Sequence, residues 1–545
     1  MWGRASWGRD VGGAMDIFTG KAAVVILMSV LIAAPATIVL LRRFRTSVVR
    51  GMRVQGGSSE DAPPPEVAPL VRVEASEARP TVERTNRSLS RTALVYVIAG
   101  LFFAFTFVAV DVIQFANGSP MALMYMLSGY IMPVLFAIWI VLPKGRTRFV
   151  YSLVWLGVSL LLLVVPVAVN DLGMLFEAVS SYLKISGSAA VLLLLFMYRR
   201  VRAVGPLVLT IAGGAMVGIN MVFDALEANF YVWSFFAGIE HALGNVTNIV
   251  LIVVLGGIVG ALAIGPVLRG VGELHERKHL SDQSLAVDVV FLWFAAAYGL
   301  WAAPDAGAFA LAVGVAFVLY KVAAFVGFRL LARAEKGGPS TDILLLRPFS
   351  LGRRSELLFD HLSKVWLRIG AIHMIAGPDL VTATVTPSEF LVFLSGRLSR
   401  RFIHNAEALR EHLEGLDLAP DPDGRHRVNQ LFCHDDVWRG AMRGLAVRSS
   451  VVLMDLRGFT SANKGCVYEL GELIRDIPLE RIIFAVDATT DNAYLEGAVD
   501  GIREQMPASS PNASISGIAS RLVSVDNSEQ GRTELLRALM KGVPA

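Results

Sequence analysis

The chain has 545 residues, of which 54% are hydrophobic and only 18% are charged, and its mean hydropathy is +0.56. This composition excludes an ordinary soluble enzyme and is typical of a chain whose helices cross a lipid bilayer several times. The formal net charge is only +4, and the basic residues lie beside the apolar segments instead of gathering on one face. We therefore expect the bilayer, and no nucleic acid, as a partner.

Roughly nine apolar segments are each about 20 residues long, which is the length that a helix needs to cross the hydrocarbon core. They lie at residues 22–41, 92–113, 121–142, 149–169, 176–198, 205–223, 247–268, 284–302 and 307–331. The stretch 224–246 is aromatic but interrupted by acidic residues, as expected for an interfacial or re-entrant helix on the outer face. The sequence therefore predicts an α-helical transmembrane bundle.

Basic residues mark one side of the predicted membrane. They follow the first, third, fifth, seventh and ninth apolar segments, whereas the loops between the others contain no lysine or arginine. Those loops hold acidic residues instead, among them Asp171, Asp224 and Asp305. Under the positive-inside rule, the pattern predicts an N-terminus outside and a cytoplasmic C-terminal domain in a cell's inner or plasma membrane.

The composition divides the chain into four parts. Residues 1–53 are interpreted as a membrane anchor and not as a cleaved signal peptide, because the apolar run continues to Leu41 and meets an arginine cluster. Residues 54–90 have mixed charge, glycine, proline and few large apolar side chains, which predicts a disordered cytoplasmic linker. Residues 91–336 hold the other eight segments, and residues 337–545 have the composition of a cytoplasmic α/β domain.

Charged residues inside apolar segments need an explanation. Lys184 and Lys321 are the two lysines concerned, and Asp288 lies near a predicted cytoplasmic end. We interpret the lysines as extending their four-carbon stems to the nearer membrane surface. A transport path usually needs several buried charges from different helices, so a transporter ranks third among the functions considered.

Residues 275–279 match the H-E-x-x-H pattern, in which two histidines on one helical face bind zinc. The pattern falls in a short basic loop between two apolar segments, and Arg277 and Lys278 would repel a cation. We interpret it as a solvated loop and expect no metal site. The two cysteines, Cys433 and Cys466, also lack zinc-ligand spacing and fit a reducing cytosolic setting.

After residue 338, short apolar runs alternate with helix-like segments. The predicted strands are residues 343–346, 371–375, 428–432, 451–454, 482–486 and 521–525. The predicted helices are residues 353–368, 436–448, 466–475, 491–505 and 530–541, and residues 387–416 are interpreted as an inserted helical pair. This alternation predicts a flavodoxin-like α/β domain with a doubly wound parallel sheet.

Residues 451–471 contain the clearest functional pattern. An apolar strand ends at Asp455, a loop with two glycines follows, and Glu469 lies in the beginning of the next helix. The carboxyl ends of strands are where open α/β sheets build their ligand crevices. A carboxylate there is able to stabilise the positive charge that develops when a base leaves ribose. We therefore predict Glu469 and Asp455 as catalytic candidates.

The same residues carry a family resemblance. Residues 342–350 resemble the first strand and loop of TIR (Toll/interleukin-receptor) domains, and residues 371–379 resemble their second strand and the loop that borders the active site. Ser461 and the run from Cys466 through Glu469 to Leu470 are similar to the serine and glutamate motif of NAD-cleaving TIR enzymes. Residues 455–471 are equally similar to nucleoside deoxyribosyltransferase-like domains, whose glutamate is a nucleophile.

The resemblance implies an enzyme that breaks the N-glycosidic bond of NAD or a related nucleotide, without a cofactor and as a homo-oligomer. Arg347, Ser350, Trp438 and Ser461 are then expected to bind the nucleotide, Arg347 through a phosphate and Trp438 by stacking on a base. Three of the candidates also have an ordinary structural interpretation: Glu469 offsets a helix dipole, Arg347 pairs with an aspartate, and Trp438 lies in the core. A non-catalytic signalling scaffold that self-associates is the alternative function.

Overall fold

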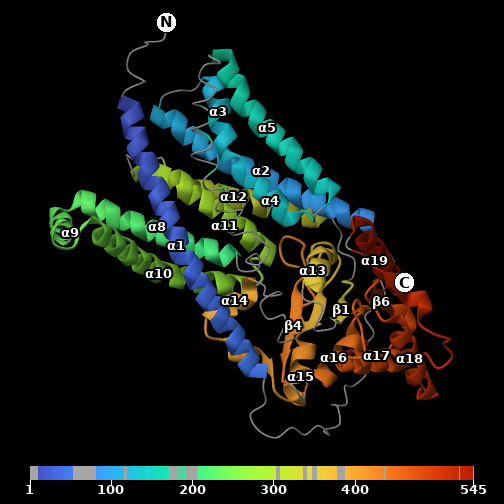
Figure 1. Ribbon diagram of the computed structural model, residues 1–545. Helices are drawn as coiled ribbons and strands as arrows, with labels where there is room; N and C mark the ends of the chain where they lie inside the picture. The colour runs from blue at the N-terminus through green and yellow to red at the C-terminus, as the bar shows by residue number, and fades with distance from the viewer. Residues whose placement is uncertain are drawn as a thin grey trace.

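The protein is described here from a computed structural model, which places a set of long helices beside a C-terminal α/β domain (Figure 1). The structure describes residues 10–52, 81–115, 119–143, 145–170, 205–301, 307–334, 340–346, 353–376, 387–434, 437–526 and 528–543, and four single positions between 179 and 190. Lys184 and most of the predicted segment 176–198 lie outside the described residues.

The N-terminal part is helical, as its composition predicts. Its described helices are α1 (Asp10–Met52), α2 (Val82–Phe115), α3 (Pro120–Tyr130), α4 (Met132–Val141), α5 (Arg146–Asn170), α8 (Gly205–Ala228), α9 (Phe230–Leu243), α10 (Asn245–Glu276), α11 (Asp282–Trp301) and α12 (Gly307–Ala334). Within the described residues, seven segments are long and apolar enough to cross a membrane. These observations support a multi-pass membrane protein.

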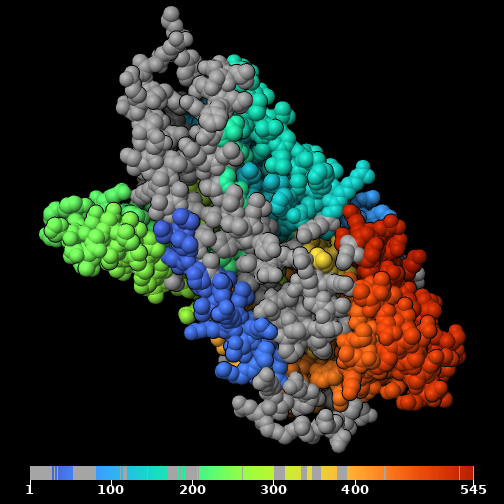
Figure 2. Space-filling model, in the orientation of Figure 1, coloured from blue at the N-terminus to red at the C-terminus, as the bar shows by residue number. Residues whose placement is uncertain are grey.

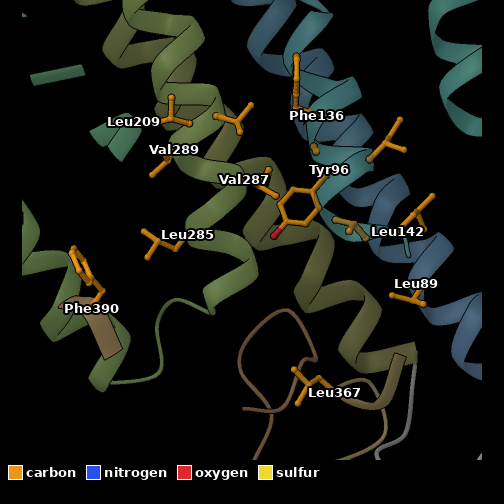
Figure 3. Close-up of a cluster of buried hydrophobic side chains, with 14 of the residues drawn as sticks. Leu89, Tyr96, Phe136, Leu142, Leu209, Leu285, Val287, Val289, Leu367 and Phe390 are labelled. Atoms are coloured by element: carbon orange, nitrogen blue, oxygen red, sulfur yellow. The ribbon is translucent and has the colours of Figure 1, made fainter. Parts of the chain in front are cut away.

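The seven segments correspond to seven of the nine predicted ones. An eighth prediction, 284–302, falls on α11, which is helical but is not among the seven. Helix α11 lies inside the bundle, and its Leu285, Val287 and Val289 belong to the buried cluster (Figure 3). Phe291 and Phe294 of the same helix are fully buried as well. Since its apolar surface packs against other helices, α11 is a central element of the bundle core.

Helices α8 and α10 pack unusually closely because glycines face each other. A Cβ atom at Gly218 would lie 2.1 Å from the carbonyl oxygen of Gly256, and one at Gly260 would lie 2.2 Å from that of Gly214. Small residues with this spacing let two apolar helices approach through their backbones. The pair projects sideways and carries α9, whose Phe230 and Tyr231 are 71% and 81% exposed (Figures 1 and 2). A helix therefore forms where the sequence predicts an interfacial one.

Lys321 does not extend alone toward the membrane surface. Its Nζ lies 2.7 Å from Oδ2 of Asp288, and the hydroxyl of Tyr320 donates to Oδ1 of the same carboxylate at 3.0 Å. The predicted extension of a lone lysine is not observed, because the neighbouring helix α11 supplies an opposite charge. The pair links α11 to α12 inside the bundle.

The C-terminal domain contains a seven-stranded sheet in which all pairs are parallel. Its strands are β1 (Ile343–Leu346), β2 (Ile372–Ile375), β3 (Phe402–Ile403), β4 (Val428–Cys433), β5 (Val451–Asp455), β6 (Ile482–Val486) and β7 (Leu522–Ser524). Its α-helices are α13 (Arg353–Trp366), α14 (Pro387–Leu394), α15 (Ala406–Glu414), α16 (Trp438–Arg448), α17 (Lys464–Asp476), α18 (Asn492–Glu504) and α19 (Glu529–Gly542). The predicted parallel sheet is confirmed.

The strand order is β3-β4-β2-β1-β5-β6-β7. Without β3 and β4, which follow the inserted segment, the order β2-β1-β5-β6-β7 is that of a flavodoxin-like sheet. If β4 is included, the six strands β4-β2-β1-β5-β6-β7 have the other common doubly wound order, 3-2-1-4-5-6 when they are numbered along the chain. In both readings the order reverses between β1 and β5. The rule for open α/β sheets therefore places a ligand crevice at the carboxyl ends of these two strands.

The two faces of the sheet belong to different cores. Ile343 and Leu453 point to a core that includes α13 and α19 and continues into the membrane helices. Leu344 and Val452 point to a second core, formed with α15, α16, α17 and α18. Because alternate residues of a strand face opposite sides, each buried strand contributes to both cores. One face of the sheet is thus packed together with the bundle.

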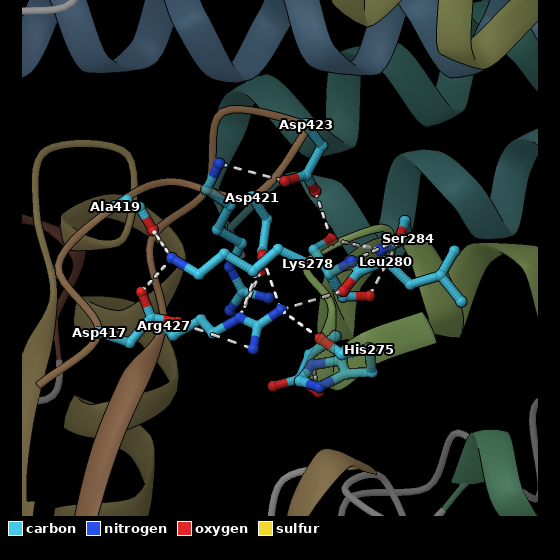
Figure 4. Close-up of polar contacts among 12 residues, drawn as sticks. His275, Lys278, Leu280, Ser284, Asp417, Ala419, Asp421, Asp423 and Arg427 are labelled. Carbon is cyan, nitrogen blue, oxygen red and sulfur yellow. Dashed lines mark hydrogen bonds and ion pairs between the residues drawn. The ribbon is translucent and has the colours of Figure 1, made fainter. Parts of the chain in front are cut away.

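The amino end of β4, where Arg427 lies, faces the loop between α10 and α11 (Figure 4). The loop before β4 contacts the loop between α10 and α11: Lys278 pairs with Asp417, and Ser281 donates to Asp423 at 2.6 Å. Arg427 binds Asp421 through Nε and Nη2 and donates to the carbonyl oxygen of His275 at 2.7 Å. These contacts fix the amino edge of the sheet to the bundle.

The zinc-like pattern lies in this contact. Helix α10 ends at Glu276 and Lys278 has a φ of 59°, so His275 and His279 do not face the same side of one helix. His275 is 6% exposed, and its Nε2 lies 3.3 Å from Oδ1 of Asp282. The loop therefore contacts the α/β domain through His275 and Lys278, whereas Glu276, Arg277 and His279 are exposed, so the loop is solvated only in part. In the described part of the chain, no three potential metal ligands cluster.

The inserted segment also attaches the domain to the bundle. Phe390 of α14 is 1% exposed, and its ring centroid lies 5.8 Å from that of Phe44 on α1. Phe393 contacts the same ring at 5.4 Å. Helix α14 contacts α10 and α11 as well. The insertion therefore supplies an apolar docking surface for three membrane helices.

Candidate functional site

Asp455 is the last residue of β5 and is 1% exposed. Its two oxygens accept hydrogen bonds from the guanidinium of Arg457, at 2.8 Å from Nε to Oδ1 and 2.7 Å from Nη2 to Oδ2. The backbone N–H of Arg457 donates to Oδ1 as well, at 3.2 Å. This bidentate pair holds the loop after β5 in a fixed turn and neutralises the carboxylate. Its geometry fits a positioning residue better than a catalytic one.

Glu469 lies in the second turn of α17, the helix that follows this loop. It is 6% exposed, and its Oε2 has no hydrogen-bond partner. Burial raises the pKa of the Glu469 carboxyl from 4.5 to about 8. Buried polar atoms are nearly always satisfied, so an unpartnered carboxylate oxygen needs an explanation, and a functional site is one.

Cys466 lies near both carboxylates. It is 4% exposed, and burial, followed by the charges of Glu469 and Asp455, raises the pKa of its thiol to about 12. A thiol with such a pKa is protonated and is a poor nucleophile at neutral pH. Cys466 is therefore a small apolar neighbour of the site and not a reactive group.

Trp438 begins α16 at the carboxyl end of β4 and is partly buried. Its ring meets Tyr468 edge to face, with the centroids 5.7 Å apart. The guanidinium of Arg439 lies 5.7 Å from the centroid of Trp438 and 5.0 Å from that of Tyr468. Trp438 is thus neither a fully buried core residue nor a freely presented ring, since it belongs to an aromatic and cationic cluster beside α17.

Of the three other predicted site residues, the structure describes only Ser461. Ser461 is exposed in the turn between β5 and α17, where Asn463 accepts from the N–H of Thr460 at 3.0 Å. Arg347 and Ser350 lie outside the described residues. The same is true of 377–386 and 435–436, which follow β2 and β4. Of the predicted site, the structure brings together Asp455, Cys466 and Glu469.

Sequence reasoning did not assign roles to Arg457, Tyr468 or Arg439. Arg457 is 2% exposed and carries a charge-neutralising pair with a residue only two positions away. The pair could have been predicted from the sequence, because an acidic and a basic residue lie in one short loop after a strand. Arg439 and Tyr468 belong to different helices, so only the packing of α16 against α17 brings them together.

A histidine pair lies at the same edge of the sheet. His404 and His434 follow the paired strands β3 and β4, and their ring nitrogens Nδ1 and Nε2 are 2.7 Å apart. One of the two nitrogens must carry a proton for this hydrogen bond. Since a metal site needs further ligands and none clusters here among the described residues, the pair is described as a hydrogen bond.

The chain matches no known protein-family model, no curated protein and no solved structure at a significant level. The resemblance to TIR and deoxyribosyltransferase-like domains therefore stays a prediction from the residues quoted for it.

Proposed function

We propose that this chain is a membrane-anchored signalling or defence effector whose α/β domain cleaves the N-glycosidic bond of NAD or a related nucleotide. The observation that carries the proposal is Glu469, a buried carboxylate with one unpartnered oxygen near the carboxyl end of β5. That strand borders the point where the strand order reverses, which is the usual ligand position in such sheets.

In the proposed reaction, the bond between nicotinamide and the anomeric carbon breaks, and water supplies the hydroxyl that replaces the base. The products are nicotinamide, ADP-ribose and a proton. The ionised carboxylate of Glu469 stabilises the positive charge that develops on the ribose. Asp455 holds Arg457 and the loop between β5 and α17 in position, so its role is indirect.

The attachment of the amino edge supports control by the membrane part. The loop 275–284 binds the loop before β4, and α14 binds α1, whereas Glu469 lies beyond the opposite ends of the strands. A change in the packing of the membrane helices can therefore be transmitted to the sheet through these contacts. The contacts leave the proposed site uncovered.

The alternative is a non-catalytic scaffold that acts by self-association, and the burial of Glu469 favours it. A catalytic carboxylate has to reach its substrate, and the side chain is 6% exposed. Transport stays third, because Lys321 is paired with Asp288 and offers no uncompensated charge for a path.

A direct assay separates the first two functions. The full chain is reconstituted at high density in vesicles with the α/β domain accessible, NAD is added, and released nicotinamide is measured. We expect release by the wild type and a loss on the order of a hundredfold in Glu469→Gln, because about 3 kcal/mol of charge stabilisation disappears. Glu496→Gln, an exposed carboxylate on α18, is the matched control and should keep full activity.

If the wild type releases neither nicotinamide nor a free base from any common nucleotide, the scaffold function replaces the enzyme. The same conclusion follows if Glu469→Gln is as active as the wild type.

A further inference from the structure

Helix α1 continues without interruption from its apolar segment to a stretch rich in arginine. The candidate span starts at Leu27, and the helix runs to Met52. Pro35 is accommodated within it. Because the helix does not break after Leu41, the arginines that follow keep the same helical register as the apolar residues before them.

One face of this continuous helix is buried against the rest of the protein. Phe44 and Val48 are fully buried, and Met52 is 3% exposed. Phe44 packs against Phe390 and Phe393 of α14. A Cβ atom at Gly51 would lie 2.4 Å from the ring of Phe402, which shows how closely the helix approaches β3. This face holds the α/β domain.

The outward face changes from apolar to basic along the same stripe. Leu31 and Ile38 are 56% and 53% exposed. Arg42 and Arg45 follow Ile38 at spacings of four and seven residues, so they lie on the same side of the helix. Both arginines are exposed. A stripe of this kind is typical of a lipid-facing surface that ends in the headgroup layer.

The distances fit that layer. At a rise of about 1.5 Å per residue, Arg42 lies about 6 Å and Arg45 about 10 Å beyond Ile38 along the axis. The headgroup region adds roughly 5 to 7 Å to each side of the hydrocarbon core. The long arginine side chains therefore reach phosphate groups from both positions.

Within the described residues, Arg42 and Arg45 form no ion pair with an acidic side chain. This differs from Arg427 and Arg457, whose guanidinium groups bind buried aspartates. An arginine guanidinium matches the geometry of a phosphate and forms two parallel hydrogen bonds with it. The missing counter-charge is therefore best supplied by the bilayer itself.

We propose that Arg42 and Arg45 bind the phosphate groups of anionic lipids in the leaflet on the side of the α/β domain. Helix α1 then makes two contacts at the same height along its axis. Its buried face binds the α/β domain through Phe44, and its basic face binds the charged membrane surface. The composition of the leaflet thereby sets how firmly the domain is kept against the bundle. This inference is independent of any enzymatic activity.

The test measures lipid selectivity of the full chain. Purified protein in detergent is equilibrated with equal amounts of phosphatidylglycerol and phosphatidylcholine, and the retained lipids are counted by native mass spectrometry. We expect the wild type to retain an excess of phosphatidylglycerol. In Arg42→Gln/Arg45→Gln that selectivity should fall roughly tenfold or more, since each basic residue near a charged membrane surface contributes about a fivefold preference.

Two control variants make the result specific. Arg410→Gln/Arg503→Gln removes the same number of exposed positive charges from α15 and α18 and should leave the selectivity unchanged. Arg42→Lys/Arg45→Lys keeps the charge and should retain most of the selectivity for phosphatidylglycerol. The proposal is overturned if the wild type shows no preference for phosphatidylglycerol, if the glutamine variant retains as much as the wild type, or if the α15 and α18 control loses as much.

Discussion

The amino and carboxyl edges of the sheet satisfy their buried charges differently. At the amino edge, Arg427 binds Asp421 and the membrane loop, and Asp423 accepts a hydrogen bond from Ser281. At the carboxyl edge, Asp455 is paired with Arg457, but Glu469 keeps an unpartnered oxygen in the interior. Paired charges such as Arg427 and Asp421 suit attachment, whereas an unsatisfied buried carboxylate costs stability and suits a site that meets a ligand.

The largest effect is expected at the attached edge. Arg427→Ala leaves Asp421, which is 4% exposed, without its cation and removes the bond to the carbonyl of His275. Removing one partner of a buried pair costs about 3 to 5 kcal/mol. The melting transition of the α/β domain, followed in the full chain in detergent, should shift down by roughly 6 to 15 °C. Arg410→Ala, at an exposed position on α15, should change it little.

An effect of opposite sign is expected at the other edge. The pKa of Glu469 is raised from 4.5 to about 8, so the folded protein holds a proton that the unfolded chain releases. The stability that this bound proton contributes is therefore fully present below pH 4.5 and is lost as the pH rises through about 8. Glu469→Gln resembles the protonated side chain and removes this loss.

The variant should melt close to the wild type at pH 5 and be more stable at pH 9, by on the order of 3 kcal/mol. Glu496→Gln, at an exposed position on α18, serves as the control. Equal melting curves of Glu469→Gln and wild type at pH 9 would show that Glu469 is solvated or paired, and the contrast between the edges would disappear.

The smallest effect concerns the rim of the attached edge. Lys278 pairs with Asp417, but the lysine side chain is 37% exposed. Solvent screens such a pair, and its loss costs less than about 1 kcal/mol. Lys278→Ala should therefore lower the melting temperature much less than Arg427→Ala does. A loss as large as that of Arg427→Ala would mean that Lys278, and not Arg427, holds the domain to the bundle.

The sequence predicts the elements of both regions well, for a physical reason. β1, β5 and β6 are continuous apolar runs because both faces of the sheet are covered. β3 was missed because two residues, Phe402 and Ile403, are too few to show a period. The position of Glu469 in α17 follows from the strand, loop and helix pattern, as predicted.

Pairing across the fold was not predictable from the sequence. Lys278 and Asp417 are 139 residues apart, and Lys321 and Asp288 are 33 apart on different helices. Nothing in the local pattern selects these partners, because tertiary packing brings them together. For the same reason, residues 387–416 were predicted only as an inserted helical pair, although Phe390 of α14 docks on α1.

The pH dependence of NAD cleavage tests the central claim most directly. If ionised Glu469 stabilises the transition state, nicotinamide release by the full chain in vesicles should rise about tenfold per pH unit from pH 6 and level off near pH 8. A profile that is flat across this range, or an absence of release at every pH, would contradict the claim that the unpartnered carboxylate at the carboxyl edge performs the chemistry.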